Sequence, residues 1–321
     1  MNPTIAASAP GKIILSGEHF VVHGSYAVAA ATNKRVYVSI RKTDGAKSRI
    51  VSEDRTSNLS SDDGSFPAVK SVARSIVSKI PYGKNDSSFD ISIKSEIPPG
   101  SGLGSSAAVS VACAAALNKF FELSLDPKDI SNAAFLGERV VHGNPSGLDI
   151  QASLLGGLIL FRRNFDPDII SVENPFSLLV IFSGTKRSTS KLIAKVARRK
   201  SEHPNYFRRL IDSASNLSLE VSTAAKIGDF EKMGSLFTIA QTDLSWIGVS
   251  TPQIDDLIDS VLGREDVLGA KLTGAGGGGS IIAAIKPGTG DALIRLFSHR
   301  YPSSFITEIP QEGVRWEKTE N

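Results

Sequence analysis

The sequence predicts an α+β fold in two domains, and three observations lead to this prediction. The length of 321 residues suffices for roughly two domains of ordinary size. The first half alternates strand-like segments with two central helices, whereas the second half is mostly helical with a few short strands. With 41% apolar and 21% charged residues, the composition is typical of a globular protein with a packed core. We expect the boundary near Asn174–Pro175, between domains 1–174 and 175–321.

In the first half, β-rich segments predict strands, and apolar residues at helical spacing predict helices. The polar stretch Thr43–Ser65 is expected to form a hairpin or a surface excursion. Asp126 is a suitable N-cap, and Pro127 fits the first helical position after it. The expected strands are Ile5–Ile14, Arg35–Arg41, Phe89–Ser95 and Gly156–Arg162, and the expected helices are Ala68–Ile80, Ala107–Phe121 and Asp126–His142.

The second half contains longer helical stretches and fewer strands. A glycine run separates two of the strands. The expected helices are Ser188–Lys200, Pro204–Ile227, Phe230–Trp246, Pro252–Leu262 and Asp291–His299, and the expected strands are Leu178–Ser183, Ala270–Leu272, Ser280–Ile285 and Phe305–Ile309.

Composition argues against several classes of protein. The net charge of +3 is small and has no basic arm or tail, so we expect no nucleic-acid partner. The single cysteine, Cys113, cannot form an internal disulfide and fits a core position in a reducing compartment. No apolar run reaches about 18 residues, and the N-terminus lacks a signal-like pattern. We therefore expect a cytoplasmic protein without a membrane partner.

A loop of glycine and serine stands directly before a predicted buried helix. Glycine lets backbone N–H groups approach a polyanion, and the following helix N-terminus adds unpaired donors and partial positive charge. The loop lacks the lysine of a Walker loop, and Ser105 replaces the third glycine of a dinucleotide fingerprint. It is predicted to hold the phosphates of a nucleotide, the alternative being a turn that only caps the helix. Its residues are Pro98, Pro99, Gly100, Ser101, Gly102, Leu103, Gly104, Ser105 and Ser106.

A second glycine run, Lys271–Ser280, lies between two predicted strands. Its glycines lose much backbone entropy on folding, and close approach to a ligand would offset that cost. We therefore assign Gly276 to the nucleotide site, although a flexible surface loop is the alternative.

Two carboxylates and a lysine supply groups that phosphoryl transfer needs. Glu138 lies in a predicted helix, and Asp149 follows the helix end in a turn. Glu138 could bind magnesium, and Asp149 could accept or orient a hydroxyl proton. Lys12 stands at the head of an apolar strand, where its charge is costly unless it is paired. Glu18 and His19 could line a polar pocket. Each of these residues could instead be an ordinary surface or turn residue.

These four segments, in this order, resemble those of the GHMP kinases, a family named for galactokinase, homoserine kinase, mevalonate kinase and phosphomevalonate kinase. The resemblance covers nearly the whole chain, and the loop Pro98–Ala107 is highly specific to the family. Segments Gly17–Gly24 and Glu138–Asp149 resemble the mevalonate kinase branch, in an archaeal-like form, rather than the galactokinases.

The resemblance implies an N-terminal ribosomal-protein-S5-like domain that binds ATP and a C-terminal ferredoxin-like domain. It implies ATP-dependent phosphorylation of the C5 hydroxyl of (R)-mevalonate, in isoprenoid biosynthesis. Asp149 would act as base or electrostatic anchor, and Lys12 would stabilise the alkoxide. Ser106 and Glu138 would hold Mg²⁺ against the phosphates. The residues implied for mevalonate contact are Glu18, His19 and Thr189.

Three alternatives stay open at this point. The chain could be a phosphomevalonate kinase or another GHMP small-molecule kinase, since Lys186 and Arg187 could bind a substrate phosphate. It could also be a non-catalytic binding protein with the same fold, although such a protein has no chemical need for Lys12, Glu138 and Asp149 together. Many relatives are dimers, so a homodimer stays open as well.

Overall fold

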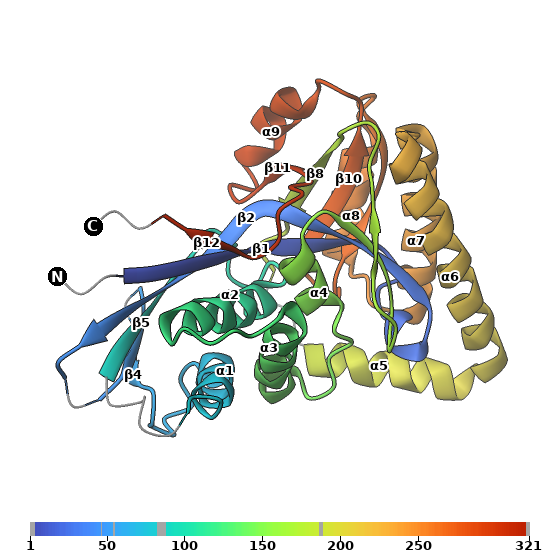
Figure 1. Cartoon of the computed structure of the whole chain (residues 1–321). Coiled ribbons are helices and arrows are strands. Elements are labelled where there is room, and N and C mark those ends of the chain that lie inside the picture. Colours follow the sequence, from blue (N-terminus) through green and yellow to red (C-terminus); the bar gives the residue numbers. More distant parts are fainter. Residues whose placement is uncertain (1–3, 46, 54, 82–87, 186–188, 319–321) are drawn as a thin grey trace.

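The computed structural model describes residues 4–318 apart from 46, 54, 82–87 and 186–188, and the side chains at 189–191 and 193 are also outside the described part. The described residues form two β-sheets with helices packed on them, which confirms the α+β class (Figure 1). None of the helices in these ranges has both the length and the apolar character needed to cross a bilayer.

The first sheet has the strand order β12-β1-β2-β5-β3-β4, and β6 pairs with both β2 and β7. All described pairs are antiparallel except β3 with β5. Helices α1 to α3 lie below this sheet in Figure 1. The strands are β1 Thr4–Ser16, β2 Tyr26–Thr43, β3 Arg49–Ser52, β4 Arg55–Asn58, β5 Ser88–Ser95, β6 Leu158–Arg162, β7 Asp168–Ile170 and β12 Arg315–Glu317. The helices are α1 Pro67–Val77, α2 Ser105–Phe120, α3 Pro127–His142 and α4 Leu148–Leu155, with a 3-10 turn, η1, at Val21–His23.

The second sheet is antiparallel, with the order β11-β8-β10-β9. Helix α7 packs along it, and α6 lies beside α7 and also contacts β1 and β2 of the first sheet (Figure 1). The strands are β8 Ser177–Phe182, β9 Val267–Thr273, β10 Ser280–Ile285 and β11 Phe305–Glu308. The helices are α5 Thr189–Glu202, α6 Pro204–Ile227, α7 Phe230–Ile247, α8 Pro252–Leu262 and α9 Gly290–Ser298.

Helix α2 is the centre of the first core. Its alanines and Val111 are buried, because the helix packs against β1, β2, α1 and α3. Small side chains permit this close approach of helix and sheet. Cys113 lies in this core, and burial raises the pKa of its thiol to about 12, so it is an inert packing residue as predicted. The packing of this central helix thereby fixes the position of its N-terminus. The glycine–serine loop Pro98–Ser106, here named the phosphate loop after its predicted role, ends at this N-terminus.

Buried hydrogen bonds tie the two sheets together. The Thr273 hydroxyl of β9 accepts from the Ile14 backbone N–H at 2.8 Å and donates to the Ile14 carbonyl at 3.1 Å. The Ser280 hydroxyl of β10 donates to the Ser101 carbonyl at 3.0 Å. These contacts fix the second sheet directly against β1 and the phosphate loop.

Most elements match the sequence prediction, and the differences have local causes. Thr43–Ser65 contains the antiparallel pair β3–β4, which confirms the hairpin. Strand β2 is longer than the predicted Arg35–Arg41, because its first half, rich in alanine, pairs with both β1 and β6. The short elements α4, β7 and β12 were not predicted. Strand β12 pairs with β1, so the last described strand lies in the first sheet. The domain boundary near Asn174–Pro175 stays a prediction.

Candidate active site

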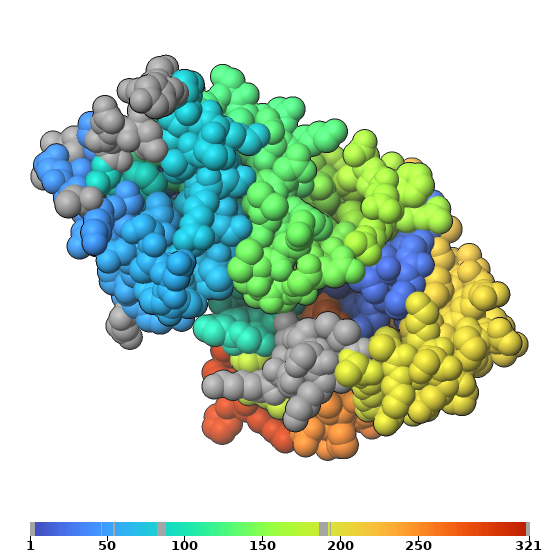
Figure 2. Space-filling view, turned by 90° about the horizontal axis from the view of Figure 1, so that it is seen from below, coloured from blue at the N-terminus to red at the C-terminus, as the bar shows by residue number. Residues whose placement is uncertain are grey.

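A cavity of about 620 Å³ opens between the phosphate loop, β1, the α3–α4 connection and the second glycine run. Figure 2 shows the surface hollowed between the green residues around α3 and the blue residues that follow β1. The cavity is lined by Lys12, Ile14, Glu18, His19, Val21, Val22, Pro98, Gly100, Ser101, Gly102, Leu103, Gly104, Ser105, Ser106, Ala107, Glu138, His142, Asn144, Pro145, Ser146, Gly147, Leu148, Asp149, Ile150, Gly274 and Ala275. All four predicted segments therefore contribute to one cavity.

The phosphate loop owes its shape to three glycines with positive φ. The φ angles of Gly100, Gly102 and Gly104 are 75°, 83° and 74°, a region that other residues rarely adopt. Gly104 is also the N-cap of α2, and no side chain caps the first N–H groups of the helix. Ser105 and Ser106 form the first turn, where free N–H donors and the helix dipole favour an anion. The loop therefore presents N–H donors and the positive end of the helix dipole to the cavity, an arrangement that suits an anion.

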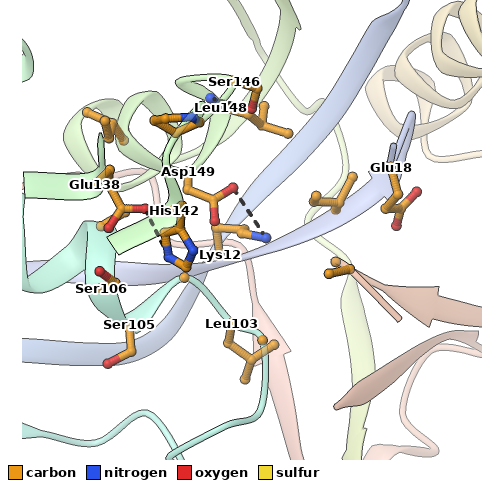
Figure 3. Close-up of a pocket in the computed structure, with 18 of the residues that line it drawn as sticks. Lys12, Glu18, Leu103, Ser105, Ser106, Glu138, His142, Ser146, Leu148 and Asp149 are labelled. Atoms are coloured by element: carbon orange, nitrogen blue, oxygen red, sulfur yellow. Dashed lines mark hydrogen bonds and ion pairs between the residues drawn. The ribbon is translucent and has the colours of Figure 1, made fainter. Parts of the chain in front are cut away.

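Lys12 lies on β1 directly beneath this loop. Its backbone N–H donates to the Leu103 carbonyl at 2.8 Å, at a register shift in the pairing of β1 with β2. A Cβ atom on Gly104 would come within 2.9 Å of Lys12 Cγ, so glycine is needed for the lysine to pass. The Lys12 side chain is only 3% exposed, and its Nζ lies 3.4 Å from Asp149 Oδ1 (Figure 3). The predicted pair of lysine and aspartate is therefore formed in the structure.

Asp149 is held by an element that the sequence analysis missed. It lies in the first turn of α4, which begins after Gly147 with a φ angle of 92° and no side-chain cap. We had expected a turn at this position. Asp149 is thus fixed by a short helix whose N-terminus, like that of α2, lies at the cavity.

Glu138 extends from α3 into the same cavity and is almost completely buried. Its Oε1 is a buried oxygen without a hydrogen-bond partner among the described residues. Burial raises the pKa of Glu138, while hydrogen bonding by Ser106 and the nearby His142 oppose this rise. An unsatisfied carboxylate oxygen beside a serine hydroxyl is a donor set that suits Mg²⁺, which uses one or two carboxylates together with phosphate oxygens. Among the described residues, no group of three or more acidic, histidine or cysteine side chains is placed to hold a metal ion.

His142 is a cavity residue to which the sequence analysis assigned no role. Its Nε2 lies 3.7 Å from Glu138 Oε2, one helical turn away (Figure 3). The sequence did hold a signal for His142: it follows Glu138 by four residues on a predicted helix, and residues at this spacing share a helix face.

The segment Gly17–Gly24 forms the opposite end of the cavity from Ser106 and Glu138 (Figure 3). Glu18 lines the cavity, but it is only 2% exposed, and its carboxylate forms an ion pair with Lys271 of β9. His19 has a positive φ of 61°, and its Nε2 contacts the Ala275 carbonyl at 3.0 Å. Both predicted residues are therefore at the cavity, each already engaged by the second glycine run or its flanking strand.

The second glycine run packs largely against the protein itself. A Cβ atom on Gly276 would lie 2.3 Å from the Val249 carbonyl oxygen, and one on Gly278 would lie 2.6 Å from the Thr185 carbonyl oxygen. The Gly277 N–H donates to the same Val249 carbonyl at 2.7 Å. Close packing thus accounts for these glycines, whereas Gly274 and Ala275 face the cavity.

Two of the predicted site residues do not line the cavity. Pro99 and Gly276 are outside its lining. Thr189 is the first residue of α5, and its side chain lies outside the described part of the chain. Lys186 and Arg187, considered as a phosphate-binding cluster, are outside the described residues altogether.

Comparison with known proteins places this geometry in a family. The model of the GHMP kinases N terminal domain matches residues 68–157, and the model of the GHMP kinases C terminal domain matches residues 221–303. A mevalonate kinase of Archaeoglobus fulgidus is 40% identical over 97% of this chain and 99% of its own length. A mevalonate kinase of Aeropyrum pernix is 33% identical over 99% of this chain and all of its own length (100%).

Solved structures of similar fold include kinases of the same family. The structure of L. major mevalonate kinase in complex with R-mevalonate matches with a TM-score of 0.82 and 26% identity, over 95% of this chain and 96% of that one. Lactococcus lactis galactokinase, at 19% identity, matches with a TM-score of 0.81 over 97% of this chain and 95% of that one, which reflects the shared fold. The chain therefore belongs to the GHMP kinase family, as its four motifs predicted.

Proposed function

We propose that this chain transfers the γ-phosphoryl group of ATP to the C5 hydroxyl of (R)-mevalonate. The observation that carries the proposal is the pair of Lys12 and Asp149, 3.4 Å apart in the cavity that the phosphate loop also lines. Its support from relatives is the 40% identity with a mevalonate kinase over nearly the full length of both chains.

The phosphate loop binds the ATP phosphates. The N–H groups of Gly100–Ser106 and the α2 N-terminus supply donors and partial positive charge without a lysine in the loop. Because the buried α2 helix and the Ser280–Ser101 hydrogen bond hold the loop from behind, these donors are in position before the nucleotide binds. Binding of this kind stabilises the charge that develops on the phosphoryl group.

Glu138 and Ser106 would hold Mg²⁺ beside the phosphates. The support is the partnerless Oε1 of Glu138 and the interaction of the Ser106 hydroxyl with the same carboxylate. When bound, Mg²⁺ would neutralise the charge that builds up between the phosphoryl group and ADP.

Asp149 and Lys12 act on the acceptor. The C5 oxygen forms a bond to the γ-phosphorus as the bond from that phosphorus to the β,γ-bridging oxygen breaks, and ADP leaves. Asp149 accepts the hydroxyl proton or fixes the hydroxyl as an electrostatic anchor. The buried Lys12 ammonium stabilises the negative charge on the attacking oxygen, and its effect is strengthened because Lys12 itself is almost fully removed from water. Glu18 and His19 would contact mevalonate at the other end of the cavity. Thr189 is a further proposed substrate contact.

A coupled assay of ADP release tests the proposal. The purified chain is given ATP and Mg²⁺ with mevalonate, phosphomevalonate, galactose or homoserine in separate reactions. Of the four acceptors, we expect only mevalonate to be phosphorylated. Turnover with phosphomevalonate but not mevalonate would identify a phosphomevalonate kinase, and no turnover with any acceptor would favour a non-catalytic role. A homodimer and a cytoplasmic location stay predictions, which light scattering and cell fractionation would test.

A further inference from the structure

Lys271 is a buried cation next to the proposed site that the mechanism above does not use. It lies on β9 in the second sheet and has no exposed surface. Its Nζ donates to the Glu18 carboxylate, to the Leu272 carbonyl at 2.7 Å and to the Ile14 carbonyl at 3.4 Å. The three N–H donors of the ammonium therefore each have an acceptor, which is what a charge removed from water requires.

The charges in this region alternate in sign. In Figure 3 the Lys12 side chain lies beside Asp149, and Glu18 lies farther away, on the side toward which the ammonium extends. Lys12 pairs with Asp149, and Glu18 pairs with Lys271. Burial raises the pKa of Glu18, and among the effects that oppose this rise the charge of Lys271 is larger than that of Lys12. Lys12 is therefore close enough to interact with Glu18, but Lys271 is the partner of that carboxylate.

Stability alone does not explain this pair. A buried ion pair is often no more stabilising than well-packed apolar side chains of similar volume, because both charges lose their hydration. The two sheets are also already joined by neutral hydrogen bonds from Thr273 and Ser280. A fully buried pair of charges beside the reacting groups therefore points to an electrostatic role.

We infer that Lys271 is a positioning residue for phosphoryl transfer: by neutralising Glu18 it leaves the Lys12 ammonium directed at Asp149 and the acceptor oxygen. Without Lys271, Glu18 would be an unpaired carboxylate near Lys12 and would compete with Asp149 for it. Attraction between opposite charges is strong in such a buried region. The inference rests on the proposed function, because it concerns the same site.

The test compares removal of one charge with removal of both. In Lys271→Met the ammonium is lost and Glu18 stays, so we expect kcat to fall about 100-fold, as for loss of a preorganised charged group. In Lys271→Met/Glu18→Gln neither charge remains, so Lys12 is again free for Asp149. We expect kcat of this double variant to exceed that of Lys271→Met, while loss of the Glu18 contact raises KM for the acceptor.

Lys70→Met is the matched control. Lys70 is 5% exposed and pairs with Asp63 at 2.7 Å, but it lies on α1 and does not line the cavity. We expect this variant to lose stability and to keep kcat. If Lys271→Met does not fold, Lys271→Gln takes its place, because its amide can still donate to Glu18.

Two results would overturn the inference. One is a folded Lys271→Met enzyme with the kcat of the wild type. The other is a folded double variant whose kcat stays as low as that of the single variant. A crystal structure of Lys271→Met adds a measurement that needs no acceptor: we expect Lys12 Nζ to turn from Asp149 towards Glu18, and an unchanged Lys12–Asp149 pair would contradict us. Absence of turnover in the wild type would instead count against the proposed function.

Discussion

The two glycine-rich loops of this chain are similar in sequence, but they differ in what surrounds their glycines in the structure. Pro98–Ser106 lines the cavity with nearly all its residues, and a Cβ atom on Gly100 would meet no atom within 4 Å. In Gly274–Gly279, Cβ atoms on Gly276, Gly277 and Gly278 would all collide with the protein. The first loop therefore leaves the space beside Gly100 to a ligand, although its Gly104 makes room for Lys12. In the second run, the three glycines let separate chain segments pack together.

The comparison teaches that glycine content alone does not identify a ligand loop. What distinguishes the first loop is its position at the free N-terminus of α2, beside Lys12. What explains the second is the Val249 carbonyl, which the Gly277 N–H already binds. Substitutions on the cavity side should therefore change kinetics in a folded enzyme, and substitutions in the second run should change stability.

The largest effect is expected from Asp149→Asn, on the cavity side. Loss of the carboxylate removes the proton acceptor or anchor, so we expect turnover to fall about 1,000-fold or more. Nucleotide binding should survive, because the phosphate loop is untouched. Steady-state kinetics and a titration with ATP measure the two effects.

Asp129→Asn is its control. Asp129 also lies in the first turn of a helix, is 37% exposed against 36% for Asp149, and pairs with Lys79. We expect it to keep normal turnover. Near-normal turnover in Asp149→Asn would remove that residue from the chemistry.

The next effect is on stability, from Gly276→Ala in the second run. Its methyl group would lie 2.3 Å from a fixed backbone oxygen, and the φ angle of 71° adds strain, so we expect a loss of about 3 kcal/mol. Gly288→Ala isolates the strain, because Gly288 has a φ of 79° and no atom within 4 Å of its Cβ position. Denaturant unfolding compares the two. Equal losses of unfolding free energy in the two variants would argue against close packing as the reason for glycine at position 276. A raised KM for ATP at unchanged stability would instead support the assignment of Gly276 to the nucleotide site.

Local signals were sufficient to predict most elements and the phosphate loop. Asp126 accepts from the Asp129 N–H at 2.8 Å, as its position before Pro127 indicated. The loop Pro98–Ser106 was likewise predicted from neighbouring residues only, namely glycines and serines directly before a stretch of apolar residues with helical character. The pair of Lys12 and Asp149 was reached through resemblance to a family, because no local pattern joins residues so far apart in the chain.

What could not be predicted depends on long-range packing. Helix α4 begins without a capping side chain and has only eight residues, so no start signal marked it. Glu18 and Lys271 are 253 residues apart, and neither spacing nor composition indicates their pairing. The role of the second glycine run depended on Val249 and Thr185, which belong to other segments.

A smaller effect is expected from Ser106→Ala. The Ser106 hydroxyl interacts with the Glu138 carboxylate, so its loss should weaken the apparent affinity for Mg²⁺ about 10-fold. Ser110→Ala is the control on the same helix, because its buried hydroxyl has no hydrogen-bond partner among the described residues and does not line the cavity. Titration of activity with Mg²⁺ distinguishes the variants. An unchanged magnesium requirement in Ser106→Ala would argue against that residue as a ligand.

The smallest effect, and the sharpest for the comparison of the loops, is expected from Gly100→Ala. The new methyl group meets no protein atom, so the cost to stability is only the strain of a φ angle of 75°, about 1 kcal/mol. Gly64→Ala carries the same strain, since Gly64 has a φ of 74°, an empty Cβ position and no place in the cavity lining. The two variants should therefore unfold at similar denaturant concentrations. Only Gly100→Ala should raise KM for ATP, because only there does the methyl group occupy space that the phosphates approach; equal KM values would mean that this glycine serves the turn alone.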